Sequence, residues 1–311
     1  MRVVFMGTPE FALPSLRALI AREEVAAVIT QPDRPKGRGE ISTAPPVKEI
    51  ALIHGIPVLQ PEKVRRPELI REVEALRPEL IVVVAFGQIL PKALLAIPRN
   101  GCVNVHASLL PAYRGAAPIP WAIMRGERQT GVTTMLMDEG MDTGPILLER
   151  TIEIGPGETS GGLSERLSRL GAELLLETLD RLSSGTLHPV PQDREAGTYA
   201  PLLKKEDGLI DWSRQAVEIE RQVLAMDPWP GAFTFYRGER WRLWSVVPSD
   251  SVESPGKPGE IVQVTERGLE VATGKGYINI KTLQPENRRR MAVREFLAGH
   301  RVQEGSLLTP S

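Results

Sequence analysis

Residues 2–30, RVVFMGTPEFALPSLRALIAREEVAAVIT, contain an apolar run, a helical pattern and a second apolar run. The two apolar runs, residues 2–7 and 25–30, contain β-branched or aromatic residues, which favour strands. Between them, residues 9–24 repeat apolar side chains at the spacing of one helix face. The order strand, helix, strand over this length is typical of a parallel βαβ unit.

The same alternation continues along the first half of the chain. Further strand patterns lie at residues 80–86 and 102–107, and helical patterns lie at residues 45–55 and 66–79. Strands that alternate with helices predict a mostly parallel sheet with right-handed crossovers. The first turn, residues 7–11, lacks the second and third glycines of the dinucleotide-binding fingerprint. We therefore expect a Rossmann-like α/β fold without a nicotinamide cofactor.

A long amphipathic helix, predicted over residues 160–182, closes the α/β region. Residues 189–205 then mix Gly, Pro and polar side chains, which is typical of a linker. Beyond the linker, a helical pattern precedes short alternating runs with glycine turns, which predict a small β-barrel. We expect a first domain over residues 1–188, a linker over residues 189–205 and a second domain over residues 206–311.

The apolar and charged fractions of the 311 residues are those of a globular protein. A single cysteine argues against a disulfide framework and favours a reducing cytoplasm. Pro9 and Glu10 interrupt the N-terminal apolar run, and no run reaches transmembrane length, so we expect a cytoplasmic protein without membrane contact. The net charge of −1 means that any contact with a nucleic acid has to rest on local basic clusters.

Three residues of complementary chemistry follow or end strand patterns in the middle of the chain. The run CVNVHA places the side chains of Asn104 and His106 on one face of a strand and the valines between them on the other. Asp142 lies in the glycine-flanked turn EGMDTG after the next strand pattern, TGVTTMLMD. In an open α/β sheet, ligands bind where the strands give way to loops. We therefore expect the three side chains to meet at that edge of the sheet.

These residue types suit acyl or formyl transfer. An Asn amide and a His N–H can donate hydrogen bonds to the negative oxygen that forms when a nucleophile attacks a carbonyl. A carboxylate near the imidazole fixes its tautomer and favours its charged form. A substrate that brings its own nucleophile needs none from the protein, and Cys102 has the surroundings of a packed strand residue. The histidines and acidic residues show no metal-ligand spacing, so we expect no metal.

Each of the three residues alone has an ordinary structural explanation. A His at the end of a strand is more often a hydrogen-bonded structural residue than a catalytic one, and an Asp among glycines more often forms the turn. The combination, with a Pro-Ala-Tyr-Arg-Gly loop between its members, favours a functional site.

Residues 33–48, DRPKGRGEISTAPPVK, are basic and rich in proline and glycine. The pattern is too irregular for a helix or a strand and predicts a long loop. Its cations Arg34, Lys36 and Arg38 either face solvent or contact a phosphate backbone, and composition alone favours neither.

Several further runs appear in this order along the chain: FMGTPEFA, TQPDRPKGRG, PPVK, VVVAFGQILP, NVHASLLPAYRGAAPI, TGVTTMLMDEGMDTG and DPWPGAF. Together they resemble the methionyl-tRNA formyltransferase family over nearly the whole chain. The NxH, SLLPxxRG and DxGxDTG elements are shared by other folate-dependent formyltransferases. The runs TQPDRPKGRG, PPVK and DPWP favour the transfer RNA enzyme within that superfamily.

The resemblance implies that a monomeric protein transfers the formyl group of 10-formyltetrahydrofolate, its co-substrate, to the amino group of methionyl initiator tRNA. It implies a Rossmann-like formyltransferase domain followed by an OB-like tRNA-binding barrel, with Asn104, His106 and Asp142 as catalytic residues and no metal. The folate pocket that it implies comprises Phe86, Gly87, Gln88, Ile89, Leu90, Ser108, Leu109, Leu110, Pro111 and Asp138. The basic residues that we expect to contact RNA are Arg34, Lys36, Arg38, Lys204, Lys205, Arg240, Arg242, Arg288, Arg289 and Arg290.

Other functions remain open at this point. A formyltransferase for an amino sugar nucleotide, or a hydrolase of formyltetrahydrofolate, would share the Asn, His and Asp. The DPWP run and the basic loop argue against both. An RNA-binding module with a degenerate transferase domain is the alternative outside enzymes, and the intact three residues argue against it.

Replacing Arg38 with alanine is expected to weaken use of the RNA acceptor and to reduce the salt dependence of its binding, because one phosphate contact is lost. Binding of the folate should not change. The measurement is the KM for the charged RNA at several salt concentrations. An unchanged KM in Arg38→Ala would count against an RNA-binding loop.

Overall fold

The structure is a computed structural model that describes residues 1–36, 41–193, 195–249 and 256–309. The chain divides into two units. The first comprises Met1–Pro118, Gln129–Glu153 and Ser164–Pro201, and the second comprises Ile119–Arg128, Ile154–Leu163 and Leu202–Ser311. The domain limits expected at residues 188 and 206 rest on composition, and they stay a prediction.

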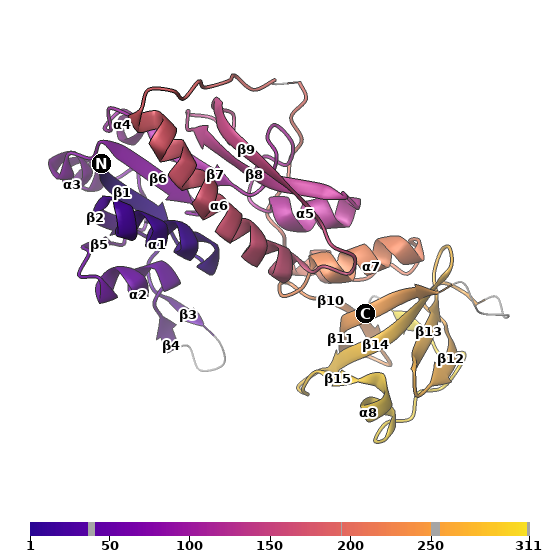
Figure 1. Ribbon diagram of the computed structural model, residues 1–311. Coiled ribbons are helices and arrows are strands. Elements are labelled where there is room, and N and C mark those ends of the chain that lie inside the picture. The colour runs from indigo at the N-terminus through magenta and orange to yellow at the C-terminus, as the bar shows by residue number, and fades with distance from the viewer. Residues whose placement is uncertain (37–40, 194, 250–255, 310–311) are drawn as a thin grey trace. The chain divides into compact units, whose positions relative to one another are not determined.

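A seven-stranded sheet forms the centre of the first unit (Figure 1). Its strand order is β5, β2, β1, β6, β7, β8, β9. The pairs from β5 to β7 are parallel, whereas β8 and β9 extend the sheet in antiparallel orientation. The mostly parallel, Rossmann-like sheet expected from the sequence is confirmed. The strands are β1 (Arg2–Gly7), β2 (Glu24–Ile29), β5 (Val58–Leu59), β6 (Leu80–Val84), β7 (Cys102–His106), β8 (Gln129–Leu136) and β9 (Ile146–Glu153).

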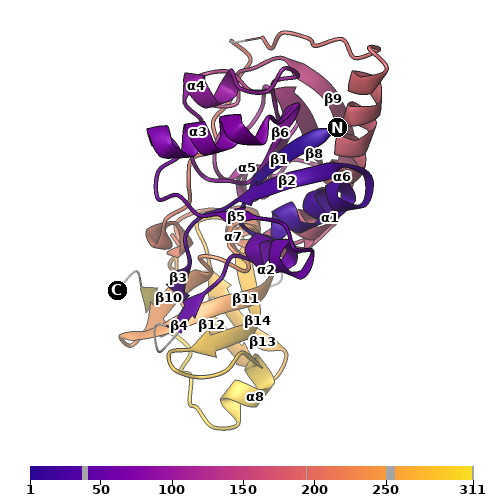
Figure 2. The same ribbon diagram turned by 90° about the vertical axis from the view of Figure 1, so that its left-hand side faces the viewer.

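Helices cover both faces of this sheet. Figures 1 and 2 show α1 and α6 against one face and α3 and α4 against the other. Because both faces are covered, every residue of β6 and β7 is buried. The helices around the sheet are α1 (Leu13–Arg22), preceded by a short 3-10 turn (Glu10–Ala12), α2 (Pro46–Ile53), α3 (Pro67–Leu76), α4 (Lys92–Leu95) and α6 (Ser160–Ser183).

The close approach of α6 to the sheet depends on Gly171. A Cβ atom at this position would lie 2.8 Å from Cγ1 of Val105 on β7. A methyl group there would force the helix and the strand apart, because protein interiors are close-packed. Val105 therefore faces α6. Asn104 and His106 alternate with it along β7 and face the other side of the sheet.

The basic segment after β2 is not wholly irregular, and the prediction of a loop without secondary structure is wrong in part. β3 (Arg34–Lys36) and β4 (Ile41–Thr43) pair as a short antiparallel hairpin. Strands of three residues are too short to show a periodic pattern in the sequence. At the base of the hairpin, Lys48 lies 2.7 Å from Asp33, and the hydrogen bonds from Gln60 and Lys48 hold the pKa of the Asp33 carboxyl below its ordinary value. Arg38 lies outside the described residues.

An antiparallel sheet forms the second unit, in the order β12, β13, β14, β11, β10, β16, with β15 paired to β14. The amide of Leu308 donates to the carbonyl of Gly259 at 2.7 Å, and the amide of Ile261 donates to the carbonyl of Ser306 at 2.9 Å. These bonds join the two ends of the strand order, so the sheet curls into the small barrel expected from the sequence. Its strands are β10 (Ala232–Tyr236), β11 (Glu239–Ser249), β12 (Ile261–Thr265), β13 (Gly268–Ala272), β14 (Tyr277–Pro285), β15 (Met291–Ala292) and β16 (Leu308–Thr309).

Short helices complete this unit. Helix α7 packs against β11 and β14, and α8 packs against β13, β14 and β15. The helical segments are α5 (Pro118–Arg125), the 3-10 helix η2 (Lys205–Gly208), α7 (Ala216–Ala225) and α8 (Val293–Leu297). Across the described ranges, no helix combines the length and apolarity that crossing a membrane requires.

Two glycine-to-alanine changes on the same helix are expected to have opposite effects on stability. Alanine gains up to about 1 kcal/mol over glycine in a helix. At Gly162 the nearest atoms to an added Cβ lie at 3.7 Å, so Gly162→Ala should not lower the melting temperature. At Gly171 the contact with Val105 adds an overpacking cost of about 1–3 kcal/mol. Thermal unfolding followed by circular dichroism should therefore show a lower melting temperature for Gly171→Ala, and a higher one would refute the close packing of α6 on β7.

Candidate functional site

Strand β7 positions the first two polar residues of the site. Its parallel pairing with β6 sets Asn104 opposite Val83, and its antiparallel pairing with β8 sets His106 opposite Thr133. Asn104 is 8% exposed and His106 is 6% exposed. Polar groups this deeply buried need hydrogen-bond partners, which the neighbouring loops provide.

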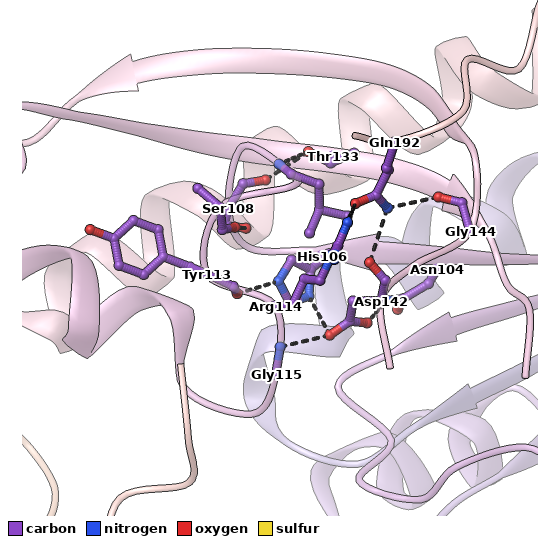
Figure 3. A network of polar contacts seen from close by, with 12 residues as sticks. Asn104, His106, Ser108, Tyr113, Arg114, Gly115, Thr133, Asp142, Gly144 and Gln192 are labelled. Atoms are coloured by element: carbon purple, nitrogen blue, oxygen red, sulfur yellow. Dashed lines mark hydrogen bonds and ion pairs between the residues drawn. The ribbon is translucent and has the colours of Figure 1, made fainter. Parts of the chain in front are cut away.

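The Asp142 carboxylate brings the expected residues together (Figure 3). Its Oδ1 accepts a hydrogen bond from Nδ2 of Asn104 at 3.3 Å. Its Oδ2 accepts one from the backbone amide of Gly115 at 2.8 Å and lies 3.7 Å from Nδ1 of His106. The three residues predicted as catalytic thus form one cluster around a single carboxylate.

The contacts of His106 define its tautomer. Nε2 lies 2.9 Å from the carbonyl oxygen of Tyr113, which can only accept, so Nε2 carries a proton. The distance of 3.7 Å between Nδ1 and Asp142 is too long for a hydrogen bond but short enough for an ion pair with a charged imidazole. Nδ1 is therefore the ring atom that faces the carboxylate.

Three residues of the site segments adopt a left-handed backbone conformation although they are not glycine. The φ angles are 53° at Asp142, 60° at Tyr113 and 48° at Ala85. This conformation is unfavourable for residues with a Cβ and is concentrated at functional sites, where surrounding contacts maintain it. The site is therefore held in its geometry by its neighbours and not by local preference.

Asp142 reaches the cluster by a different route from the one expected. β8 runs antiparallel to β7 and ends at Leu136, which pairs with Val103 at the start of β7. The turn over residues 137–145 has to return along β7 to bring the carboxylate to the other two side chains. The expectation that all three meet because each follows a strand at the same edge is wrong, because alternating sequence patterns do not reveal strand direction.

The loop after β7 is shaped by hydroxyl groups. The Ser108 hydroxyl donates to the carbonyl of Ala112 at 2.6 Å. The Thr133 hydroxyl donates to the carbonyl of Ser108 at 2.7 Å and accepts from the amide of Leu110 at 3.1 Å. Ser108 and Leu110 were expected to hold the folate, and their polar groups here fix the loop itself. Sequence reasoning did not indicate Thr133, because its role depends on the pairing of β8 with β7.

The loop after β6 contains most of the other residues expected to bind folate. Phe86 and Leu90 are buried, whereas Ile89 is 64% exposed. The Gln88 side chain accepts from the amide of Val64 at 3.0 Å and donates to the carbonyl of Glu62 at 3.3 Å. Gly87 has a φ angle of 82°. Because the Gln88 amide is already bonded to the protein, the loop offers a ligand mainly its backbone groups.

Asp138 shapes the turn that carries Asp142. Its Oδ1 accepts from the amide of Gly140 at 3.0 Å and from the Thr143 hydroxyl at 2.7 Å. A pocket of about 760 Å³ lies beside this turn. It is lined by Lys92, Leu95, Ala96, Arg114, Met137, Asp138, Glu139, Gly140, Thr143 and Tyr199. Asp138 is the only residue of the expected folate set in this lining.

Part of the expected RNA-binding set forms a group of stacked side chains on the barrel. The guanidinium of Arg242 lies 3.9 Å from the centre of the Trp244 ring, and that of Arg290 lies 4.7 Å from the same ring. Arg240 lies 3.8 Å from the ring of Phe233. Burial lowers the pKa of the Arg242 guanidinium from its ordinary value. The stacking holds three cations on one part of the barrel.

The remaining basic residues are more scattered. Arg34, Lys204, Lys205 and Arg288 are exposed, and Arg289 forms an ion pair with Glu295. Nothing is described for the Lys36 side chain. The barrel therefore brings together Arg240, Arg242 and Arg290, and Arg289 is engaged elsewhere.

Neither a metal centre nor a thiol nucleophile emerges from the described part of the chain. It contains no group of three or more His, Cys, Asp or Glu residues placed to hold a metal ion. Cys102 is buried, and burial raises the pKa of its thiol to about 12. A thiol with such a pKa stays protonated near neutral pH, so it does not act as a nucleophile.

Comparison with known proteins defines the class. Residues 1–179 match the family described as "Formyl transferase", and residues 202–301 match "Formyl transferase, C-terminal domain". The chain is thus a member of the formyl transferase class.

Two relatives narrow the class. The chain is 58% identical to methionyl-tRNA formyltransferase from Citrifermentans bemidjiense over 309 residues, which covers 99% of this chain and 96% of the relative. It is 55% identical to methionyl-tRNA formyltransferase from Geobacter sulfurreducens, with coverage of 99% and 96%. The chain therefore belongs to the methionyl-tRNA formyltransferase family.

Solved structures share the fold at lower identity. HypX from Aquifex aeolicus, solved with tetrahydrofolic acid, matches with a TM-score of 0.63 and 22% identity, and the match covers 98% of this chain and 50% of HypX. WlaRD, a sugar 3N-formyl transferase solved with dTDP and 5-N-formyl-THF, matches with a TM-score of 0.67 and 16% identity, over 93% of this chain and 99% of WlaRD. At these identities the likeness concerns the fold alone.

Replacing Asp142 with asparagine is expected to lower kcat for formyl transfer by about 100-fold or more, with the fold retained. Asparagine tolerates the left-handed backbone, so the melting temperature should change little. The amide loses the negative charge that faces His106. Asp211→Asn is a matched control, because the Asp211 carboxylate likewise accepts two hydrogen bonds, from the amide and the hydroxyl of Ser213 in the second unit. Turnover of Asp142→Asn within about threefold of the parent would remove Asp142 from the catalytic set.

Proposed function

We propose that this chain transfers the formyl group of 10-formyltetrahydrofolate to the α-amino group of methionine esterified to initiator tRNA. The observation that carries the proposal is the Asn104, His106 and Asp142 cluster. It occurs in a chain that is 58% identical to a methionyl-tRNA formyltransferase over 99% of its length. We also propose that the protein acts as a monomer in the cytoplasm.

The reaction begins with the amine. An α-amino group has a pKa near neutrality, so a large fraction is uncharged at physiological pH. Its lone pair attacks the formyl carbon, a new N–C bond forms, and the carbonyl electron pair moves to oxygen. Asn104 Nδ2 and an N–H of His106 stabilise the resulting oxyanion. For His106 Nε2 to do so, the formyl oxygen replaces the Tyr113 carbonyl as its acceptor.

The second step releases tetrahydrofolate. The bond between the formyl carbon and N10 breaks, and the carbonyl re-forms. The attacking nitrogen loses a proton and N10 gains one. A water beside the Asp142 carboxylate relays this proton, and the carboxylate, 3.7 Å from Nδ1, orients the imidazole whose Nε2 donates to the oxyanion. Atoms and charge balance without a metal or a protein nucleophile.

Binding of the folate rests on two loops. The side chains of Ser108, Gln88 and Asp138 already bond to the protein. We therefore assign recognition of the pterin ring to backbone groups of residues 86–90 and 108–111. Backbone donors and acceptors have fixed positions, so they can form specific hydrogen bonds with the polar edge of a flat ring.

Binding of the RNA rests on basic side chains. Arg240, Arg242 and Arg290 are held by stacking on aromatic rings of the barrel, so they lose little side-chain entropy when they contact phosphates. We propose these three as the contacts of the second unit, and Arg34, Lys36 and Arg38 as those of the first unit.

The proposed function is tested by giving the purified protein 10-formyltetrahydrofolate with methionyl initiator tRNA, methionyl elongator tRNA, an amino sugar nucleotide, or no acceptor. We expect formylmethionine with the initiator RNA and little product with the others. A formylated sugar would support the sugar-nucleotide alternative, and release of formate without acceptor would support a hydrolase. RNA binding without turnover would support the binding-module alternative, and each of these three results would overturn the proposal.

A further inference from the structure

A segment expected to be part of the linker is bonded to the site. The amide of Val190 donates to the carbonyl of Ile146 at 2.8 Å, next to the end of the Asp142 turn. Further along, the amide of Arg114 donates to the carbonyl of Thr198 and the amide of Ala200 donates to the carbonyl of Arg114, both at 2.8 Å. Residues 190–193 and 195–200 therefore contact both the turn and the loop that surround the cluster.

Gln192 lies between these two attachments, and its side chain makes four hydrogen bonds (Figure 3). Nε2 donates to the backbone carbonyl of Asp142 at 2.9 Å and to that of Gly144 at 2.7 Å. Oε1 accepts from Nε of Arg114 at 3.1 Å and from Nη2 at 2.7 Å. Both N–H groups and the oxygen of the amide are thus used within the protein.

Arg114 fixes which way this amide points. It is 3% exposed, and within the described chain its guanidinium bonds only to neutral oxygens, those of Gln192 and of the Asp193 backbone. A guanidinium can only donate, so the amide oxygen has to face it. The amide nitrogen then faces the two carbonyl groups of the turn. If the amide were flipped, its NH2 group would face the Arg114 guanidinium and its oxygen would face the two carbonyl groups, so these hydrogen bonds would be lost.

Contacts inside the turn fix only part of its shape: Asp138 bonds to Gly140 and Thr143, whereas the carbonyl groups of Asp142 and Gly144 are held by Gln192. Asp142 has a φ angle of 53°, a left-handed conformation that an aspartate adopts more readily than most residues with a Cβ but that surrounding contacts maintain. A Cβ atom at Gly144 would lie 1.8 Å from the carbonyl oxygen of Leu136 at the end of β8. The backbone at Gly144 therefore packs directly on that strand, with no space for a side chain. Loss of the bonds from Gln192 would leave two carbonyl groups without these donors and would release the backbone that carries the carboxylate.

We propose that Gln192 is a positioning residue for the chemical step. Its amide, oriented by Arg114, holds the turn from Asp142 to Gly144, so that the Asp142 carboxylate faces Asn104 and His106. This inference rests on the proposed function, since it assigns Gln192 to the formyl-transfer step. A displacement of the carboxylate by about 1 Å is enough to cost on the order of 100-fold in rate.

Two variants separate the hydrogen bonds from the shape of the side chain. Gln192→Met keeps a similar length and loses all four bonds. Gln192→Glu keeps an acceptor for Arg114 but sets a carboxylate oxygen against the carbonyl groups of Asp142 and Gly144. Both variants should lower kcat by about tenfold or more, and the KM values for formyltetrahydrofolate and for methionyl-tRNA should stay within about threefold.

A second readout does not depend on activity. Hydrogen exchange of the peptides over residues 112–118 and 137–146 should be faster in Gln192→Met than in the parent, because the bond from the Gly115 amide to Asp142 is weakened. Gln222→Met is the matched control. Nε2 of Gln222 also bridges two backbone carbonyls, at 2.8 Å and 2.9 Å, but in the second unit. This control should lose stability without a change in kcat or in the exchange of those two peptides.

The outcomes are distinguishable. Full kcat in a folded Gln192→Met, full kcat in Gln192→Glu, or a loss confined to KM would each overturn the positioning role. So would unchanged exchange of the two peptides. If the parent protein forms no formylmethionine, the proposed function fails, whereas faster exchange in Gln192→Met would still establish that Gln192 holds the turn.

Discussion

The Asp142 carboxylate is the contact on which the geometry of the site depends. It accepts hydrogen bonds from the Asn104 side chain and the Gly115 backbone, and it faces the free ring nitrogen of His106. One charged acceptor thus links a strand, the loop after it and a distant turn. Because bonds to a charged group are stronger than neutral ones, removing the charge affects all three elements together.

The fold holds the partners of this carboxylate in fixed positions. β7 is covered on both faces, with Val105 packed against α6 near Gly171 and the polar residues on the opposite side. The strand is therefore rigid, and its side chains have defined directions. Within the Asp142 turn, Asp138 bonds to Gly140 and Thr143, and Gln192 bonds to the carbonyl groups of Asp142 and Gly144. Precision at the site thus comes from packing on one side of the sheet and from hydrogen bonds on the other.

Periodicity and residue type were sufficient to predict much of the fold and the three site residues. The features that could not be predicted depend on contacts between segments far apart in the sequence. The strands and helices around β1 and β6 follow from apolar spacing, and the Asn, His and Asp are recognisable by their chemistry. Thr133, Arg114 and Gln192 gave no such signal, because their roles depend on long-range contacts: β8 pairs with β7, and Gln192 bonds to Arg114 and to the Asp142 turn. Helix α5 begins with two prolines among its first three residues, and it too was not predicted.

We propose that Asp142 and Asn104 act as one unit in formyl transfer and not as two independent contributors. A double-mutant cycle tests it most directly, with kcat for formyl transfer measured in Asn104→Ala, in Asp142→Asn and in the double variant. Residues that act as a unit give strongly non-additive losses. The double variant is expected to lose about as much kcat as the more damaged single variant. Losses that multiply, as for two independent sites, would contradict it.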